Sequence, residues 1–161
     1  MTEATYATID KPRIQSGAPL ALAGRRERFT AATMQNVPAL WMRFIPEAMK
    51  LGTVTQTYGL VFDRDSGVDY MAAIVVPSSA KLPAGWTSIR LPAQMYAVFP
   101  HRAHVSKIGE TVAAACQWLE RSDHQRIGGN ADRPAFLEHY SEAFDPNTGM
   151  GGMEVWVPVK S

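Results

Sequence analysis

The segment Tyr58-Gly-Leu-Val-Phe62-Asp63 has a counterpart later in the chain, Tyr140-Ser-Glu-Ala-Phe144-Asp145, and both read Tyr-x-x-x-Phe-Asp. Each copy leads into a turn that ends in glycine, and a Val-Pro pair follows further on, at Val76-Pro77 and Val157-Pro158. The copies are offset by 82 residues at the tyrosines and by 81 at the prolines. Several matches near one offset favour a duplicated unit, although turn chemistry alone can produce part of the likeness.

The two halves predict the same order of elements. In the first half, residues 20–30 alternate as a strand does, residues 36–48 repeat apolar side chains at helical spacing, and residues 53–63 and 70–76 are rich in β-branched and aromatic residues. In the second half, strands are expected at 86–101 (interrupted by Pro92), 134–141 and 153–159, with a helix marked by Ile108, Val112 and Leu119. Pro46 is expected to kink or interrupt the first helix, since proline lacks an amide hydrogen.

We therefore predict a single α+β domain over residues 1–161, in which two β-α-β-β units at about 17–78 and 86–160 follow a loose tail at 1–14. One unit alone has too little core, and pairing the two about a pseudo-two-fold axis joins their strands into one antiparallel sheet. The two long helices would then flank a central cleft, and small-molecule sites tend to occur at such interfaces.

The composition argues against several classes of function. Charged residues make up 19% of the 161 and the formal net charge is +1, so no strong field gathers nucleic acid or an anionic membrane surface. A lone cysteine, Cys116, cannot form an internal disulfide and is typical of a reducing compartment. No apolar stretch approaches the ~20 residues of a membrane span, and residues 1–10 lack the pattern of a signal peptide. We expect a cytoplasmic protein that binds neither nucleic acid nor membrane directly.

The segment Phe136-Leu-Glu138-His-Tyr140 carries the most informative polar residue. Side chains alternate along a strand, so Phe136, Glu138 and Tyr140 share one face. If that face meets solvent, Glu138 is an ordinary surface residue. If it points into the cleft, apolar walls make an ionised Glu138 costly unless a cationic or hydrogen-bonding ligand, or a protein group such as a tyrosine hydroxyl, compensates. The alternation alone leaves both orientations open.

Other candidates have a structural interpretation beside the functional one. Trp41 and Trp118 lie on or beside the apolar helix faces, where they can be core residues or ligand walls. Tyr58 is the repeat counterpart of Tyr140, so one of them can line the cleft while the other packs. The His-x-x-His spacing at 101–104 lacks a nearby carboxylate, and no P-loop, dinucleotide glycine pattern or Ser-His-Asp order is present. We therefore expect no metal and no cofactor.

Segments spread over about residues 17–160 carry a family likeness through their order and spacing. They are Val37-Pro-Ala-Leu-Trp41-Met-Arg-Phe44, Tyr58-Gly-Leu-Val-Phe62-Asp63 leading to Asp69-Tyr70, Leu91-Pro-Ala-Gln-Met-Tyr96-Ala-Val-Phe99-Pro-His101, Ile108-Gly-Glu-Thr111, Gln117-Trp118-Leu119, Pro134-Ala-Phe-Leu-Glu138-His-Tyr140 and Met153-Glu-Val-Trp-Val-Pro158-Val. Together they resemble the GyrI-like effector-binding domains. These domains occur at the C-terminus of many AraC-type and MerR-type regulators and as stand-alone proteins. The resemblance implies the duplicated β-α-β-β fold that the repeat also predicts.

The resemblance implies a central, aromatic-lined cleft with a buried glutamate that meets cationic, lipophilic ligands, as in multidrug-binding bacterial relatives, and Glu138 falls at that position. Some stand-alone relatives are hydrolases of strained small-ring compounds that use a glutamate with a pocket tyrosine, and in others the domain interferes with DNA gyrase. Arg102-Ala103-His104 stands where family members often carry a Gly-Pro pair, so ligand preference is not carried over. The first unit already uses residues 17–78, which leaves no room for a helix-turn-helix.

These observations lead to three hypotheses. In the first, the chain is a stand-alone binding protein for a cationic or amphipathic small molecule, with Glu138 as the charge partner and walls made by Phe136, Tyr140, Tyr58, Trp41 and Trp118. In the second, it is a hydrolase in which Glu138 acts as general base or acid and Tyr140 or Tyr58 donates to a developing oxyanion. In the third, it is a gyrase-modulating or regulatory interaction protein with a protein partner or a homodimeric state.

Overall fold

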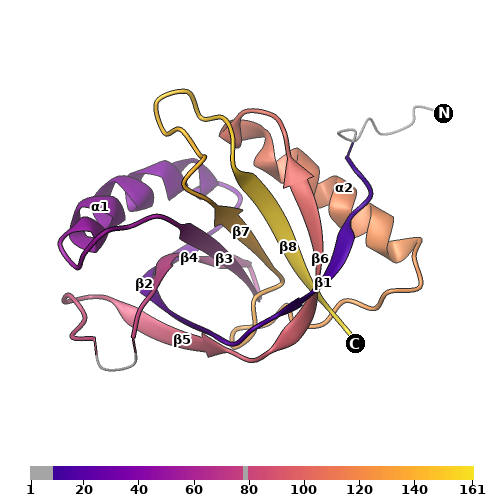
Figure 1. The fold of residues 1–161 in the computed structure, drawn as a ribbon, viewed down its shortest axis with the longest axis horizontal. Helices are drawn as coiled ribbons and strands as arrows, with labels where there is room; N and C mark the ends of the chain where they lie inside the picture. Colours follow the sequence, from indigo (N-terminus) through magenta and orange to yellow (C-terminus); the bar gives the residue numbers. More distant parts are fainter. Residues whose placement is uncertain (1–8, 78–79) are drawn as a thin grey trace.

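A computed structural model describes residues 9–77 and 80–161, which form one sheet of eight strands and two α-helices (Figure 1). The strands are β1 (Arg13–Gly17), β2 (Leu20–Phe29), β3 (Thr57–Arg64), β4 (Gly67–Val75), β5 (Thr87–Leu91), β6 (Gln94–His101), β7 (Phe136–Tyr140) and β8 (Met153–Val159). The helices are α1 (Val37–Met49) and α2 (Ile108–Glu120), and a short 3-10 turn precedes each of them.

The order of the strands shows the duplication. The sheet runs β1-β6-β8-β7-β3-β4-β2-β5, with antiparallel pairing throughout. Its inner six strands consist of β6-β8-β7 followed by β3-β4-β2, so each unit supplies three strands in mirrored order and the two units meet where β3 pairs with β7. Each unit also supplies one helix of 13 residues between its first and second strand of that set. The α+β fold with two β-α-β-β units is confirmed.

The motif that suggested the duplication is not in structural register, and that part of the prediction is wrong. Tyr58 lies near the start of β3, whereas Tyr140 is the last residue of β7. Phe62 is a buried strand residue, whereas Phe144 lies in the loop between β7 and β8. The likeness came from similar turn chemistry after a tyrosine, because Asp, Gly, Asn and Pro recur in turns for local reasons.

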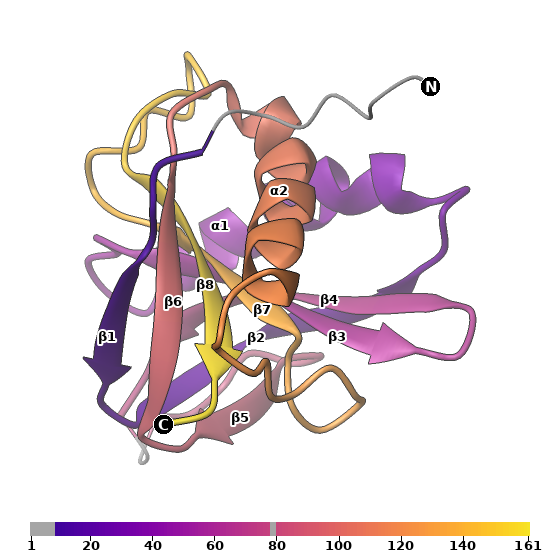
Figure 2. The ribbon, with the colours of Figure 1, turned by 90° about the vertical axis from the view of Figure 1, so that its right-hand side faces the viewer.

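A long antiparallel ribbon, in which β1 and β2 pair with β6 and β5, connects the two ends of the sheet. Gly17 of β1 faces Gln94 of β6, and three residues further on Leu20 of β2 faces Leu91 of β5, so the register continues unchanged from one strand pair to the next. This ribbon curls the sheet, as Figures 1 and 2 show. β1 begins at Arg13, inside the segment expected to be a tail, while residues 1–8 lie outside the described part of the chain. Its exposed side chains show no alternation from which a strand could be predicted.

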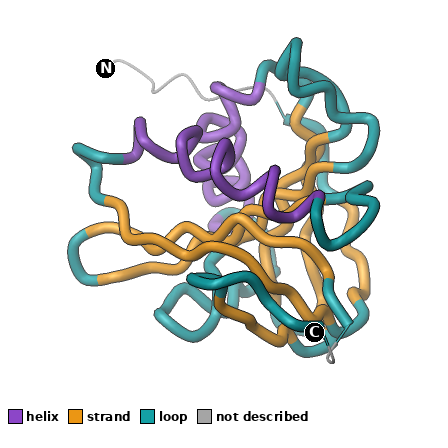
Figure 3. Tube along the Cα trace, turned by 90° about the vertical axis from the view of Figure 1, so that its left-hand side faces the viewer, coloured by secondary structure: helices purple, strands orange, loops and turns teal. Residues whose placement is uncertain are grey.

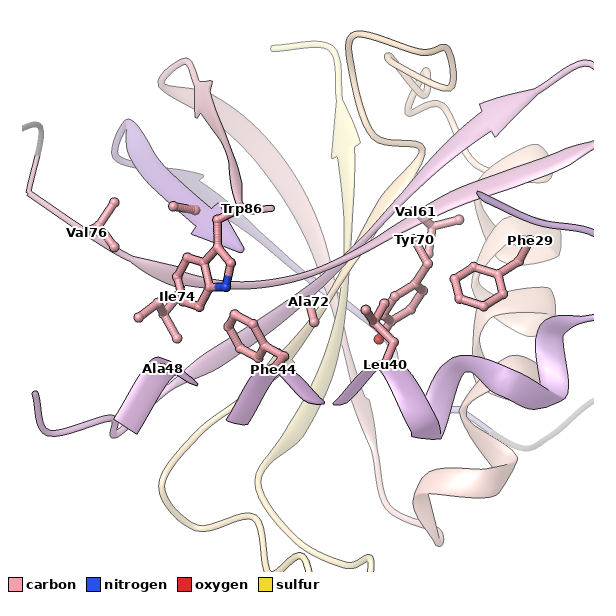
Figure 4. Close-up of a cluster of buried hydrophobic side chains, with 11 residues drawn as sticks. Phe29, Leu40, Phe44, Ala48, Val61, Tyr70, Ala72, Ile74, Val76 and Trp86 are labelled. Carbon is pink, nitrogen blue, oxygen red and sulfur yellow. The ribbon is translucent and has the colours of Figure 1, made fainter. Parts of the chain in front are cut away.

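Both helices lie on the same face of the sheet (Figure 3). The buried side chains of α1, Leu40, Phe44 and Ala48, recur every four residues, and Phe44 stacks on Trp86 with ring centroids 5.0 Å apart (Figure 4). Contrary to expectation, α1 continues through Pro46 to its end at Met49. Pro46 lies on the exposed side of the helix, where water can satisfy the carbonyl that loses its partner.

α2 covers the second unit in the same way. Its buried residues Ala115 and Leu119 pack against alternate residues of β6 and β8, including Phe99 and Val157. The opposite face of the sheet, inside the curl, has a cluster of its own with Leu22, Leu60, Phe62, Met71, Leu91 and Val98 among its members. Among the described residues, no helix is long and apolar enough to cross a membrane.

Candidate functional site

The register of the central strands decides which way Glu138 points. Glu138 of β7 is paired with Gly59 of β3 on one side and with Val155 of β8 on the other. Val155 belongs to the cluster under α2, so Glu138 lies on the face that the helices cover. Phe136, two residues earlier on the same face, packs against the clusters of both helices. The side chain of Glu138 therefore points inward at the junction of the two units, and only 7% of the residue is exposed.

Two phenols hold the carboxylate of Glu138. The hydroxyl of Tyr70, on β4, donates a hydrogen bond to Oε1 at 2.5 Å, and the hydroxyl of Tyr140 donates to the same oxygen at 2.9 Å. The indole N–H of Trp41, on α1, in turn donates to the Tyr70 hydroxyl at 3.0 Å. The side chains of Trp41, Tyr70, Glu138 and Tyr140 thus form one connected hydrogen-bond network that joins α1, β4 and β7.

The electrostatics of this network keep the phenols protonated. Burial raises the pKa of the Glu138 carboxyl, while the hydrogen bonds from Tyr70 and then Tyr140 act to lower it. The pKa values of Tyr70 and Tyr140 lie well above the ordinary value, first because both are buried and then because Glu138 is negative. Among the described residues, no arginine, lysine or histidine forms an ion pair with Glu138. An ionised Glu138 is therefore hydrogen-bonded but not neutralised by a protein cation.

Aromatic rings pack around the carboxylate. Trp41 meets the ring of Tyr70 edge to face at 6.2 Å between centroids and the ring of Tyr140 at 5.6 Å. Phe144, in the loop after β7, packs against Tyr140 at 5.1 Å. Trp41 and Phe144 are only partly buried, so this side of the site is closed by side chains near the surface.

Of the residues predicted from the sequence, the structure brings Glu138, Tyr140 and Trp41 into direct contact, with Phe136 beside them on β7. Tyr58 lies on the opposite face, because its neighbour Gly59 is the residue that faces Glu138. It packs inside the curl against His139 and Trp156. Of the two tyrosines considered for a hydrolase, only Tyr140 touches Glu138.

Trp118 packs on the second unit, edge to face with Phe99 at 6.0 Å and parallel to His124 at 6.3 Å. The rings that surround Glu138 do not include it. His101 is buried and uses both ring nitrogens, Nδ1 to the Thr111 hydroxyl and Nε2 to the backbone carbonyl of His104. Among the described residues, no group of three or more potential ligands could hold a metal ion.

Two residues of the candidate site, Tyr70 in the network and Phe144 beside it, were not among the residues predicted from the sequence. Tyr70 lies 68 positions from Glu138, on an apolar strand where one further aromatic residue gives no functional signal. Phe144 follows β7 in a loop, where neither strand nor helix spacing says which way a side chain points. The dipeptide Asp69-Tyr70 belongs to the stretch that carried the family likeness, and aligned family sequences are the signal that could have pointed to Tyr70.

A second carboxylate on the opposite face offers an instructive contrast. Glu154 of β8 forms a salt bridge with Arg13 at 2.9 Å and accepts a hydrogen bond from the indole of Trp156 at 3.0 Å. The pKa of Glu154 is lowered to about 2, first by His139 and further by Trp156 and Arg13. Glu154 is thus paired with the guanidinium of Arg13, whereas Glu138 pairs with no basic side chain of the described residues.

Comparison with solved structures shows the same architecture in other proteins. The structure of SAV2435 bound to tetraphenylphosphonium matches with a TM-score of 0.74 at 23% identity, covering 94% of this chain and 95% of that one. The C-terminal domain of EcmrR matches with a TM-score of 0.68 at 12% identity, covering 96% of this chain and 99% of that domain. At these identities the likeness shows the fold.

Sequence comparison adds a regulator and a family. The transcriptional regulator BrlR of Pseudomonas aeruginosa is 27% identical over 143 residues, which cover 83% of this chain and 50% of BrlR. The chain thus spans about half the length of this curated relative. The family model of the GyrI-like small molecule binding domain matches residues 10–160, nearly the whole chain. The chain belongs to the GyrI-like family of small-molecule binding domains.

Proposed function

We propose that this domain binds a lipophilic organic monocation whose positive charge lies near Glu138, against the rings of Trp41, Tyr70 and Tyr140. One observation carries the proposal: Glu138 is buried on the helix-covered face, its hydrogen bonds come from phenols, and no basic side chain of the described residues pairs with it. A buried carboxylate in this condition is costly when ionised, and a bound cation removes much of that cost.

The arrangement suits a cation with apolar substituents better than a compact, hydrated one. Ring faces attract a cation by ~0.5–2 kcal/mol each, depending on how far the site is desolvated. Apolar substituents add about 25 cal/mol for every Å² that they remove from water. A lipophilic cation therefore gains from the carboxylate, from the rings and from burying its apolar substituents, whereas a compact ammonium ion loses a tightly bound hydration shell and has no apolar surface to bury.

Access to Glu138 depends on Trp41. Its indole packs on both Tyr70 and Tyr140 and is held by a hydrogen bond to the Tyr70 hydroxyl. A ligand as large as tetraphenylphosphonium would have to move this indole, or shift α1, to reach the carboxylate. Because a neutral hydrogen bond contributes only about 1 kcal/mol net, exchanging the contacts of Trp41 for those of a ligand ring is energetically feasible.

The relatives support the proposal. The solved SAV2435 structure holds tetraphenylphosphonium, a lipophilic monocation, on the same fold. BrlR is a transcriptional regulator of which this chain covers half, so a regulatory use of the bound ligand, through a partner or a further domain, belongs to the proposal as well. The finer assignments, Glu138 as the charge partner and the three rings as walls, rest on the geometry of this chain.

Calorimetric titration with a charge series tests the proposal. The probes are the cation tetraphenylphosphonium, the anion tetraphenylborate, which has the same four phenyl groups, and the neutral triphenylphosphine oxide, which has three. We expect measurable heat and a saturable isotherm with the phosphonium, weaker binding of the oxide and none of the borate. Equal affinity for the three probes, or no binding of the phosphonium, would refute the proposal. The hydrolase alternative is tested separately: a strained small-ring electrophile is incubated with the protein for a long time and analysed by mass spectrometry, and a product that forms only with the protein would favour that alternative.

A further inference from the structure

Gly59 sits in the middle of β3, where glycine is a poor choice of residue. It pairs with Ala72 of β4 and with Glu138 of β7, so it occupies the strand between the two that carry Tyr70 and Glu138. Glycine weakens a strand because it loses more conformational entropy on folding and has no side chain to pack. The backbone of Gly59 is ordinary extended strand without a positive φ, so conformational freedom does not explain this glycine.

Space explains it. A Cβ atom added at Gly59 would lie 2.7 Å from Oε1 of Glu138 and 2.8 Å from Cζ of Tyr70, and closer still to the Tyr70 hydroxyl. Ordinary van der Waals contacts of a Cβ lie at 3.4–4 Å, so none of these contacts can be made without movement. The phenol of Tyr70 therefore passes over β3 at the position where Gly59 leaves room for it, and reaches Glu138 on the next strand.

The alternatives for relieving such a contact are few. Tyr70 is 2% exposed and its hydroxyl is fixed by Trp41 on one side and by Glu138 on the other. Glu138 is held by Tyr140 as well. Moving either group away from an added Cβ breaks at least one bond of the network, because close-packed interiors relax only partially.

We propose that Gly59 is a positioning residue of the Glu138 site: by lacking a side chain it lets the Tyr70 hydroxyl cross β3 and hold the carboxylate in place. Its effect on ligand binding rests on the proposed function, whereas its effect on the titration of Glu138 does not. Among the described residues, the titratable groups that face Glu138 are Tyr70 and Tyr140, so a change in its titration reports on these two phenols.

Replacing Gly59 by Ala tests this inference. Displacement of Tyr70 removes the hydrogen bond that opposes the effect of burial, so the midpoint of the Glu138 titration moves upward. The affinity for tetraphenylphosphonium falls about tenfold or more, the usual effect of losing a hydrogen bond to a charged group. The readout is the carboxyl ¹³C shift of Glu138 across pH in protein labelled at glutamate, with the signal assigned by its disappearance in Glu138→Gln.

Gly109→Ala is the matched control, since an added Cβ there meets nothing within 4 Å and alanine favours the helix that contains it. It should leave both the titration and the affinity unchanged. Tyr70→Phe should raise the Glu138 midpoint by about as much as Gly59→Ala does, and the double variant should show little further change. If Gly59→Ala fails to fold, the double variant Gly59→Ala/Tyr70→Leu should recover folding, because leucine removes both Tyr70 atoms that clash with the added Cβ and frees Glu138 from that phenol.

The results of these experiments test the role of Gly59 and the proposed function separately. A Gly59→Ala protein that titrates and binds like the Gly109→Ala control overturns the inference, and so does a Gly59→Ala/Tyr70→Leu variant that stays unfolded when the single variant is unfolded. If the wild-type protein does not bind the phosphonium, the proposed function fails, while the titration of Glu138 still decides the role of Gly59.

Discussion

Replacing Glu138 by Gln removes the charge at the centre of the candidate site and keeps the shape of the side chain. Gln retains an oxygen that can accept the hydrogen bonds now donated by Tyr70 and Tyr140. A cation held against the rings about 6 Å from the carboxylate interacts with it by about 3 kcal/mol at an effective dielectric constant of about 20. Losing this term weakens binding about 100-fold, since each 1.4 kcal/mol corresponds to about a factor of ten.

The same substitution is expected to leave the fold as stable as before or to stabilise it. Burial raises the pKa of Glu138 above its ordinary value, so ionising this carboxyl costs more free energy in the folded state than in the unfolded state. The cost of ionising Glu138 in the folded state is absent below the ordinary pKa of the carboxyl and grows as the pH rises through its raised pKa. Gln removes the cost, and the free energy of unfolding should therefore rise or stay level while the affinity falls. A fall in affinity without a fall in the free energy of unfolding distinguishes loss of the ligand's charge partner from a general loss of structure.

Calorimetry with tetraphenylphosphonium and with neutral triphenylphosphine oxide, together with urea denaturation, measures both effects. Glu154→Gln is the matched control, because Glu154 is also a strand carboxylate hydrogen-bonded to an aromatic side chain but lies on the opposite face of the sheet. We expect Glu138→Gln to abolish the preference for the cation and Glu154→Gln to preserve it. Undiminished affinity in Glu138→Gln, or an equal loss in both variants, would show that the charge of Glu138 takes no part in binding.

Two further predictions concern the scaffold. The pKa of Glu154 is lowered to about 2 from 4.5, so its contribution to the free energy of unfolding is complete above pH 4.5 and is lost as the pH falls toward 2. Urea denaturation across this pH range should therefore show a flatter pH dependence for Glu154→Gln than for the wild-type protein. An unchanged slope would contradict the lowered pKa of Glu154. Phe44→Ala should lower the free energy of unfolding by about 3–5 kcal/mol because it empties the space against Trp86, whereas Met42→Ala, exposed on the same helix, should change it by less than about 0.5 kcal/mol.

The predictions from sequence succeeded where the signal is local. The alternation of β7 put Phe136, Glu138 and Tyr140 on one face, and helical spacing identified the buried side of α1 with Trp41 beside it. A family likeness then favoured the inward orientation of Glu138, and the register of β7 between β3 and β8 agrees with it. The two inferences from periodicity use only residues that are neighbours along the chain.

The sequence left positions open where they depend on strand pairing. The motif did not decide which of Tyr58 and Tyr140 lines the cleft; because a strand changes face at every residue, the pairing of Gly59 with Glu138 puts Tyr58 on the other side. Tyr70 was missed because its contact with Glu138 spans β3, the strand that lies between β4 and β7. No spacing within either segment encodes that contact.

The amino-acid sequence by itself determined the strands and helices of the two units, which side chains share a face of each element, and the presence of one carboxylate between two rings, because side-chain periodicity is a property of the local backbone. The tertiary structure decided the register of β3 against β7, the reach of Tyr70 across Gly59 and the placement of Trp41 over the tyrosines. These depend on which arrangement buries the most apolar surface while satisfying the buried polar groups, and that balance is set by the whole chain at once.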